Sequence, residues 1–117
     1  MTLDLFLNKV RNNEPISFDE TMAIITNHYA YRPTEFSNGF NEHRIVNTAG
    51  VNEGSCKIFS FARLHRLSKE QTLNLFGDYY RLDVLQDPDG RKHANIRNFI
   101  RYGWDGIEFS SEALTAK

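Results

Sequence analysis

Residues 52–63 read Asn-Glu-Gly-Ser-Cys-Lys-Ile-Phe-Ser-Phe-Ala-Arg, and the rest of the chain is organised around this segment. Its first residues include types that favour the start of a helix, where four backbone N–H groups lack partners: Asn52, Gly54 and Ser55. Apolar and aromatic side chains then recur at helical spacing: Ile58, Phe59, Phe61, Ala62 and His65. A wide apolar face of this kind predicts a helix buried inside the domain.

Cys56, the only cysteine of the chain, falls in the first turn of this expected helix. Free N–H groups and the positive end of the helix dipole can lower a thiol pKa from about 8.5 to roughly 3.5–7.5, and Lys57 adds a nearby cation. The first turn therefore has two functional interpretations, a reactive thiolate or a small anion site. We favour a third interpretation, in which Cys56, Phe59 and Ala62 are core positions and the thiol is a small buried hydrophobe. The turn also supplies candidate ligand-binding residues: Asn52, Glu53, Ser55 and Lys57.

Length and composition exclude several classes of protein. A chain of 117 residues is one domain and buries about two-thirds of its unfolded surface without disulfides. Lys and Arg number 14 and Asp and Glu number 15, so a net charge of -1 gives no general attraction to nucleic acid or to acidic membranes. A single cysteine excludes an internal disulfide and indicates a reducing cytosol. We expect no cofactor, and we expect no metal because no H-x-x-x-H or H-E-x-x-H spacing occurs. Neither a membrane span nor a signal peptide is expected.

The first half of the chain predicts two amphipathic helices followed by strands. Thr2 can cap a first helix, which ends near Pro15. Ser17 and Glu20 then form a capping box for a second helix. The apolar face of the second helix is expected to comprise Phe18, Met22, Ile25 and Tyr29. Two short strands are expected at residues 35–37 and 44–47.

The second half adds helices, one strand and a tail. Ser68 and Gln71 form a second capping box, Gly77 ends that helix, and residues 78–86 are expected to form another short helix. A helix over about 93–102 and a strand at 107–109 follow, and residues 111–117 are expected to be a loose tail. These patterns predict a single compact α+β domain over 1–117, with about five helices and a small short-stranded β-sheet.

A catalytic Cys–His pair is one hypothesis for the chemistry. His65 lies nine residues after Cys56, about 180° around the same helix, and therefore cannot reach it. His93 begins a different helix and can lie next to Cys56 in the fold. The sequence thus leaves open a Cys-dependent enzyme with Cys56 as nucleophile and His93 as base, although no complete catalytic set is evident.

A basic stripe and a group of aromatic residues are two further candidate sites. The stripe comprises Arg91, Lys92, His93, Arg97 and Arg101, and such a stripe can contact phosphates. More often it is a solvated face or pairs with acids, and the net charge favours that interpretation, so nucleic-acid binding is the weaker alternative. The aromatic residues can line a pocket or close the core: Tyr79, Tyr80, Tyr102 and Trp104.

Several motifs together resemble the HopJ type III effector protein family. They are Asn52–Phe59, Asp78–Arg81, Pro88–Gly90, His93–Phe99 and Gly103–Ile107, and the resemblance extends from Leu3 to Lys117. It implies a small one-domain bacterial protein, delivered into host cells by a type III secretion system. It implies no activity and no catalytic residues.

These observations favour a non-enzymatic binding or interaction protein over the two alternatives. Its partner is expected to be an unidentified protein or small molecule, and not a membrane. We expect a monomer in the bacterial cytoplasm, or a secreted protein if the resemblance extends to delivery.

Overall fold

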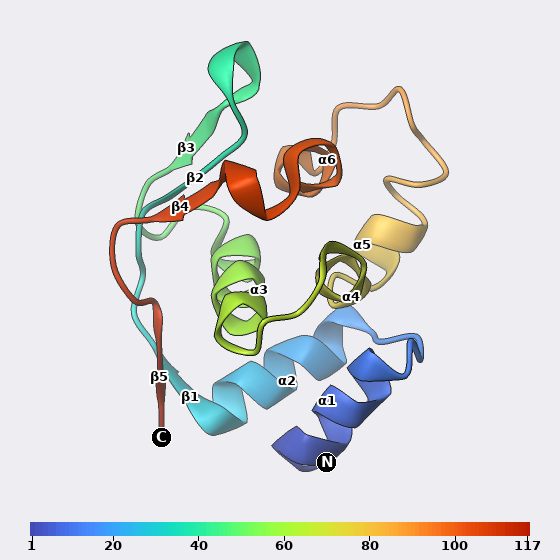
Figure 1. Cartoon of the computed structure of the whole chain (residues 1–117), viewed down its shortest axis with the longest axis vertical. Coiled ribbons are helices and arrows are strands. Elements are labelled where there is room, and N and C mark those ends of the chain that lie inside the picture. Colours follow the sequence, from blue (N-terminus) through green and yellow to red (C-terminus); the bar gives the residue numbers. More distant parts are fainter.

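Helix α3, Glu53–Leu64, lies at the centre of the computed structural model, which describes residues 1–117 (Figure 1). The other α-helices are α1 (Leu3–Arg11), α2 (Phe18–His28), α4 (Lys69–Asn74), α5 (Asp78–Arg81) and α6 (Ala94–Tyr102). Two 3-10 turns are η1 (Asn41–His43) and η2 (Gly103–Gly106). The strands are β1 (Tyr29–Tyr31), β2 (Phe36–Asn38), β3 (Ile45–Asn47), β4 (Ile107–Phe109) and β5 (Leu114–Ala116). The predicted α+β class is confirmed, with six α-helices where about five were expected.

The body of α3 is buried, which confirms the interior helix predicted from residues 52–63. Its buried side chains are Cys56, Ile58, Phe59, Ser60, Phe61 and Ala62. The Phe59 ring lies 4.9 Å from the ring of Phe99 on α6 and 5.9 Å from that of Phe36 on β2, centre to centre. One aromatic residue on α3 therefore packs against both the sheet and the last helix, which positions these elements around a common core. None of the helices has both the length and the apolar composition needed to cross a membrane.

Side-chain caps begin three of the helices where the sequence predicted them. The hydroxyl of Thr2 accepts a hydrogen bond from the backbone N–H of Leu5, and complete capping boxes open α2 and α4. The far end of α2 differs from the prediction. Tyr29 leaves the expected helical face and begins β1, because its backbone is extended, with φ -135° and ψ 145°.

The strands form two small antiparallel sheets. In the three-stranded sheet the order is β3-β2-β4, and Ser37 at the centre of β2 lies opposite Val46 and Glu108. The strands expected near 35–37, 44–47 and 107–109 are thereby confirmed. The second sheet pairs β1 with β5 and lies beside α2 (Figure 1).

The prediction of a loose tail over residues 111–117 is wrong. Leu114–Ala116 forms β5 against β1, and both Ala113 and Leu114 are buried. Backbone bonds continue on both sides of the strand, from the N–H of Arg32 to the carbonyl of Ala113 and from the N–H of Lys117 to the carbonyl of His28. The tail is ordered because its two apolar residues join the core while its backbone completes a sheet.

Candidate functional site

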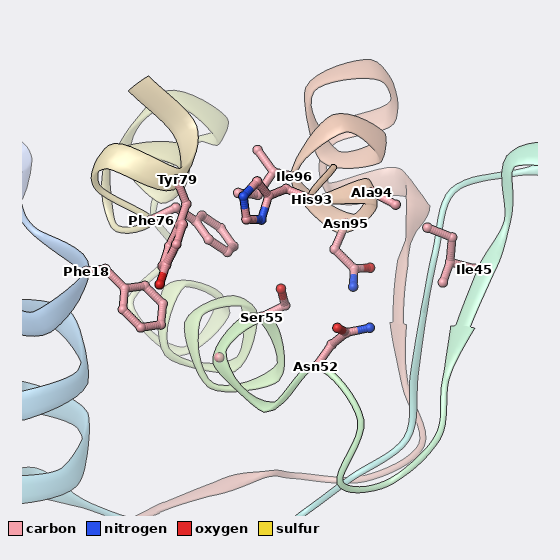
Figure 2. Close-up of a pocket in the computed structure, with 11 residues that line it drawn as sticks. Phe18, Ile45, Asn52, Ser55, Phe76, Tyr79, His93, Ala94, Asn95 and Ile96 are labelled. Atoms are coloured by element: carbon pink, nitrogen blue, oxygen red, sulfur yellow. The ribbon is translucent and has the colours of Figure 1, made fainter. Parts of the chain in front are cut away.

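A cavity of about 410 Å³ lies where the N-terminal ends of α3 and α6 meet (Figure 2). Its lining residues are Phe18, Ile45, Asn52, Gly54, Ser55, Phe76, Tyr79, His93, Ala94, Asn95 and Ile96. Aromatic rings form one wall, asparagines form the opposite wall, and Ser55 and His93 lie between them (Figure 2). Four residues selected from the sequence therefore converge here: Asn52, Ser55, Tyr79 and His93.

Both helices begin at the cavity without a side-chain cap. Asn52 precedes α3 with φ 55° and ψ 50°, and His93 precedes α6 with φ 58° and ψ 54°. Both residues are left-handed, a conformation that Asn tolerates better than most non-glycine residues. The backbone N–H groups of residues 53–55 and 94–96 have no hydrogen-bond acceptor within the protein. Free backbone N–H donors and the positive ends of two helix dipoles therefore face the cavity.

A buried asparagine network joins the starts of the two helices. The Oδ1 atom of Asn47 accepts from Nδ2 of Asn52 at 2.7 Å and from Nδ2 of Asn95 at 2.9 Å. Asn95 in turn accepts from Nδ2 of Asn47 at 3.2 Å and from Nδ2 of Asn38 at 3.1 Å. The side chain of Asn52 is thus used as a tether to β3 and is not available to cap α3. Asn38, Asn47 and Asn95 were not among the candidate residues predicted from the sequence.

The aromatic wall and Asp83 fix the position of His93. The ring of Tyr79 lies 4.9 Å from the ring of Phe18 and 5.1 Å from that of His93, centre to centre. The Nε2 atom of His93 lies 3.0 Å from Oδ2 of Asp83, which follows α5. This pair was not predicted from the sequence. The only feature of the sequence that indicated it is the short separation between Asp83 and the start of α6.

Cys56 is placed away from the cavity, in the core. Its side chain is buried, and Sγ donates to the carbonyl of Thr34 at 3.5 Å. Burial raises the pKa of the Cys56 thiol, as the favoured interpretation of a buried core residue requires, whereas the reactive-thiolate interpretation required a lowered pKa. His93 bonds to Asp83 and Cys56 to Thr34, so the structure does not join them as the nucleophile and base of the Cys-enzyme hypothesis.

Other candidates from the first turn of α3 also lie outside the cavity. The Nζ atom of Lys57 lies 4.7 Å from the centre of the Tyr31 ring, a cation–π contact. Glu53 is close to the same tyrosine, where burial is the main cause that raises the pKa of Tyr31 and the Glu53 carboxylate adds to it. Glu53 and Lys57 are each two residues away from Ser55. Because successive helical residues point about 100° apart, both side chains lie on the opposite side of α3 from Ser55.

The remaining candidates have structural partners. The Arg97 guanidinium donates to the carbonyls of Lys92 and Asp87, at 2.6 and 2.8 Å, and so secures the loop before α6. Tyr80 packs against the core, and Nε1 of Trp104 donates to the carbonyl of Leu67 at 3.0 Å. The basic stripe is therefore partly used within the fold. No group of three or more His, Cys, Asp or Glu side chains is arranged to hold a metal ion.

Comparisons with known proteins give one family and one solved structure. The model of the family described as HopJ type III effector protein matches residues 3–114. A crystal structure described as that of the unknown function protein VPA0580 is 47% identical over 100% of this chain and 95% of that chain, with a TM-score of 0.93. No curated protein matches this chain.

Proposed function

Since this chain belongs to the HopJ type III effector protein family, whose description names no reaction, we propose that it is a small-molecule binding protein. Its ligand carries an acidic group, a carboxylate or a phosphate, next to a flat apolar part. The observation that carries this proposal is the cavity itself, in which two uncapped helix starts face an aromatic wall.

The helix starts supply the recognition of the acidic group. The N–H groups of residues 53–55 and 94–96 lack protein acceptors, and the cavity lining contains neither Lys nor Arg. Two positive dipole ends close together repel each other, and an anion between them removes that repulsion. Each helix end contributes about 0.3–1 kcal/mol to an anion at an exposed site, and more where the site is partly buried.

The aromatic wall supplies the recognition of the apolar part. Phe18, Phe76 and Tyr79 line one side of the cavity (Figure 2). The Phe18 and Tyr79 rings meet edge to face, with 79° between their planes, and aromatic rings of this kind can pack against a flat group. A volume of about 410 Å³ falls within the roughly 300–1,000 Å³ typical of small-molecule sites. A benzoate-sized ligand therefore suits both walls at once.

The test is an NMR titration of the full chain with benzoate, phenyl phosphate and neutral benzamide. We expect the first two ligands to shift the backbone amides of residues 53–55 and 94–96, and benzamide to shift them much less. Equal shifts with benzamide, or none with the acids, would overturn the proposal. Comparing benzoate with phenyl phosphate identifies the preferred acidic group.

A matched pair of variants isolates the electrostatic part. Ala94 is exposed and is the first residue of α6, so Ala94→Glu places a carboxylate at the helix start, and Ala94→Gln places a neutral group of the same size there. We expect the Glu variant to lose benzoate binding and the Gln variant to keep most of it. Both variants should fold because Ala94 is exposed, and in the Glu variant an acidic residue in the first helical turn is also stabilising.

The family description also supports a proposal about location. We propose that the protein is made in the bacterial cytoplasm as a monomer and is delivered through a type III system. A translocation reporter fused to the full chain tests delivery, since the signal in host cells should disappear when the secretion system is inactivated. A reporter signal that persists without the system would contradict it.

A further inference from the structure

Ser55 and His93 line the cavity, and Asp83 contacts His93 from outside it; these three side chains form an arrangement suited to acyl transfer. Ser55 comes from the first turn of α3, His93 from the start of α6, and Asp83 from the turns after α5. The Ser55 hydroxyl points toward the His93 ring across the cavity (Figure 2). We infer that Ser55 is a nucleophile, His93 its base and Asp83 a positioning residue, and that they hydrolyse small carboxylic esters.

The hydrogen bond to Asp83 sets the tautomer of His93. Oδ2 of Asp83 lies 3.0 Å from Nε2 of His93, so a neutral imidazole carries its proton on Nε2 and donates it to the carboxylate. The lone pair is then on Nδ1, which has no hydrogen-bond partner in the protein and is free to accept a proton from a hydroxyl. The contact with Tyr79 on the ring holds the imidazole in this orientation.

The helix starts supply an oxyanion site for this reaction. A tetrahedral intermediate carries a negative oxygen, which backbone N–H groups stabilise when they are already oriented. The free N–H groups of residues 53–55 lie next to the Ser55 side chain, and those of 94–96 lie across the cavity. Ser55 and His93 are not hydrogen-bonded without substrate, and such bonds commonly tighten only when substrate is bound.

Ser55 is better placed for this role than Cys56. The two residues are neighbours on α3, but about 100° of helical rotation turns Cys56 into the core and Ser55 into the cavity. The intrinsically stronger nucleophile is thus buried against Thr34, and the hydroxyl is accessible.

The reaction balances with water as the only co-reactant. Oγ of Ser55 bonds to the ester carbon while its proton moves to Nδ1 of His93. The C–O bond to the leaving alcohol then breaks, and the alcohol takes that proton. Water attacks the acyl-Ser55 ester and gives a proton to His93, the C–Oγ bond breaks, and Oγ recovers the proton. One ester and one water thus become one carboxylic acid and one alcohol, and the acid is the kind of ligand on which the proposed function rests.

A fluorophosphonate probe on the full chain tests the inference. Oγ displaces fluoride from phosphorus, which leaves a stable phosphonyl group that intact-mass and peptide mass spectrometry locate. We expect modification of Ser55 in the unmodified sequence, its loss in Ser55→Ala, and no change in the control Ser111→Ala, an exposed serine outside the cavity. His93→Asn, chosen because Asn tolerates the left-handed conformation, should slow labelling at least about 100-fold.

Asp83→Asn separates positioning from structure. We expect labelling to slow about tenfold or more, while the melting temperature and the benzoate-induced amide shifts stay unchanged. No labelling of the folded chain, or labelling at a residue other than Ser55, would overturn the inference. Benzoate binding in Ser55→Ala tells the two proposals apart, since it persists if only the esterase activity is absent and is missing if the binding proposal itself fails.

Discussion

Replacing Asn47 by Leu should destabilise the protein because it leaves a buried amide unpaired. Asn47 is fully buried, and its Oδ1 accepts from Nδ2 of Asn95 at 2.9 Å and Nδ2 of Asn52 at 2.7 Å. Leu has nearly the same shape, so the packing loss is small and the main effect is electrostatic. The Asn95 donor then has no partner, and Asn52 loses its tether to β3.

The magnitude follows from the groups left without partners. A buried unsatisfied donor costs about 1–3 kcal/mol, and the lost bond to the exposed Asn52 adds about 0.5–1.5 kcal/mol. We therefore expect Asn47→Leu to lower the free energy of unfolding by about 2–4 kcal/mol. Asn95→Leu should cost a similar amount, because it leaves Nδ2 of Asn47 without its bond to Asn95 Oδ1.

The double variant Asn47→Leu/Asn95→Leu makes the test decisive. Removing both partners leaves neither amide unpaired, and Nδ2 of Asn38 keeps its bond to the Asn95 carbonyl at 2.8 Å. The double change should therefore cost no more than the costlier single change, which gives a coupling energy of at least about 2 kcal/mol.

Urea unfolding followed by the fluorescence of Trp104 measures all three variants. Trp104 is the only tryptophan and packs on Phe59 and Phe99, so its emission reports the core. If the double variant loses the sum of the two single losses, unpaired amides are not the cause of the destabilisation.

Three further predictions concern the core and its edges. Burial, with a smaller effect from Arg11, lowers the pKa of His65 below its ordinary 6.5. The folded state therefore binds fewer protons than the unfolded state. The contribution of His65 to stability is complete above pH 6.5 and is lost as the pH falls through the folded pKa. Unfolding midpoints at pH 7.5 and 5 should show this loss, and the part due to His65 should be absent in His65→Gln. Leu114→Ala should cost about 2–4 kcal/mol in urea unfolding, and Thr115→Ala on the same strand less than about 0.5 kcal/mol, because only Leu114 is buried. Cys56 should react with iodoacetamide only as fast as the protein opens, so urea should accelerate labelling; fast labelling of the native state would contradict its burial.

Features set by nearby residues were predictable from the sequence. Both capping boxes join residues three apart, Ser17 with Glu20 and Ser68 with Gln71, so their partners lie within one turn of the chain. The apolar spacing of α3 is equally local. The resemblance to the HopJ family is likewise confirmed, since its motifs are contiguous segments of the chain.

Features set by distant partners were not predictable. The segment before Lys117 has only a short apolar pair, and its pairing depends on β1, which lies more than eighty residues earlier in the chain. Asn47 was expected in a strand, but its burial and that of Asn38 were not predicted, because buried asparagines in strands make sense only once their partner Asn95 is known. Arg97 and Trp104 looked available for ligands for the same reason, since the carbonyls that they contact belong to other segments.

The open start of α3 at the cavity depends on the conformation of Asn52. A side-chain cap stabilises a helix by about 0.5–2 kcal/mol, and Asn is among the best capping residues. Here the left-handed backbone of Asn52 turns its amide toward Asn47, so the cap is not made and the first N–H groups of α3 stay free. The bond to Asn47 offsets the missing cap and at the same time ties the start of α3 to that of α6 through Asn95. The network that stabilises the fold is therefore also what keeps both helix starts open to the cavity.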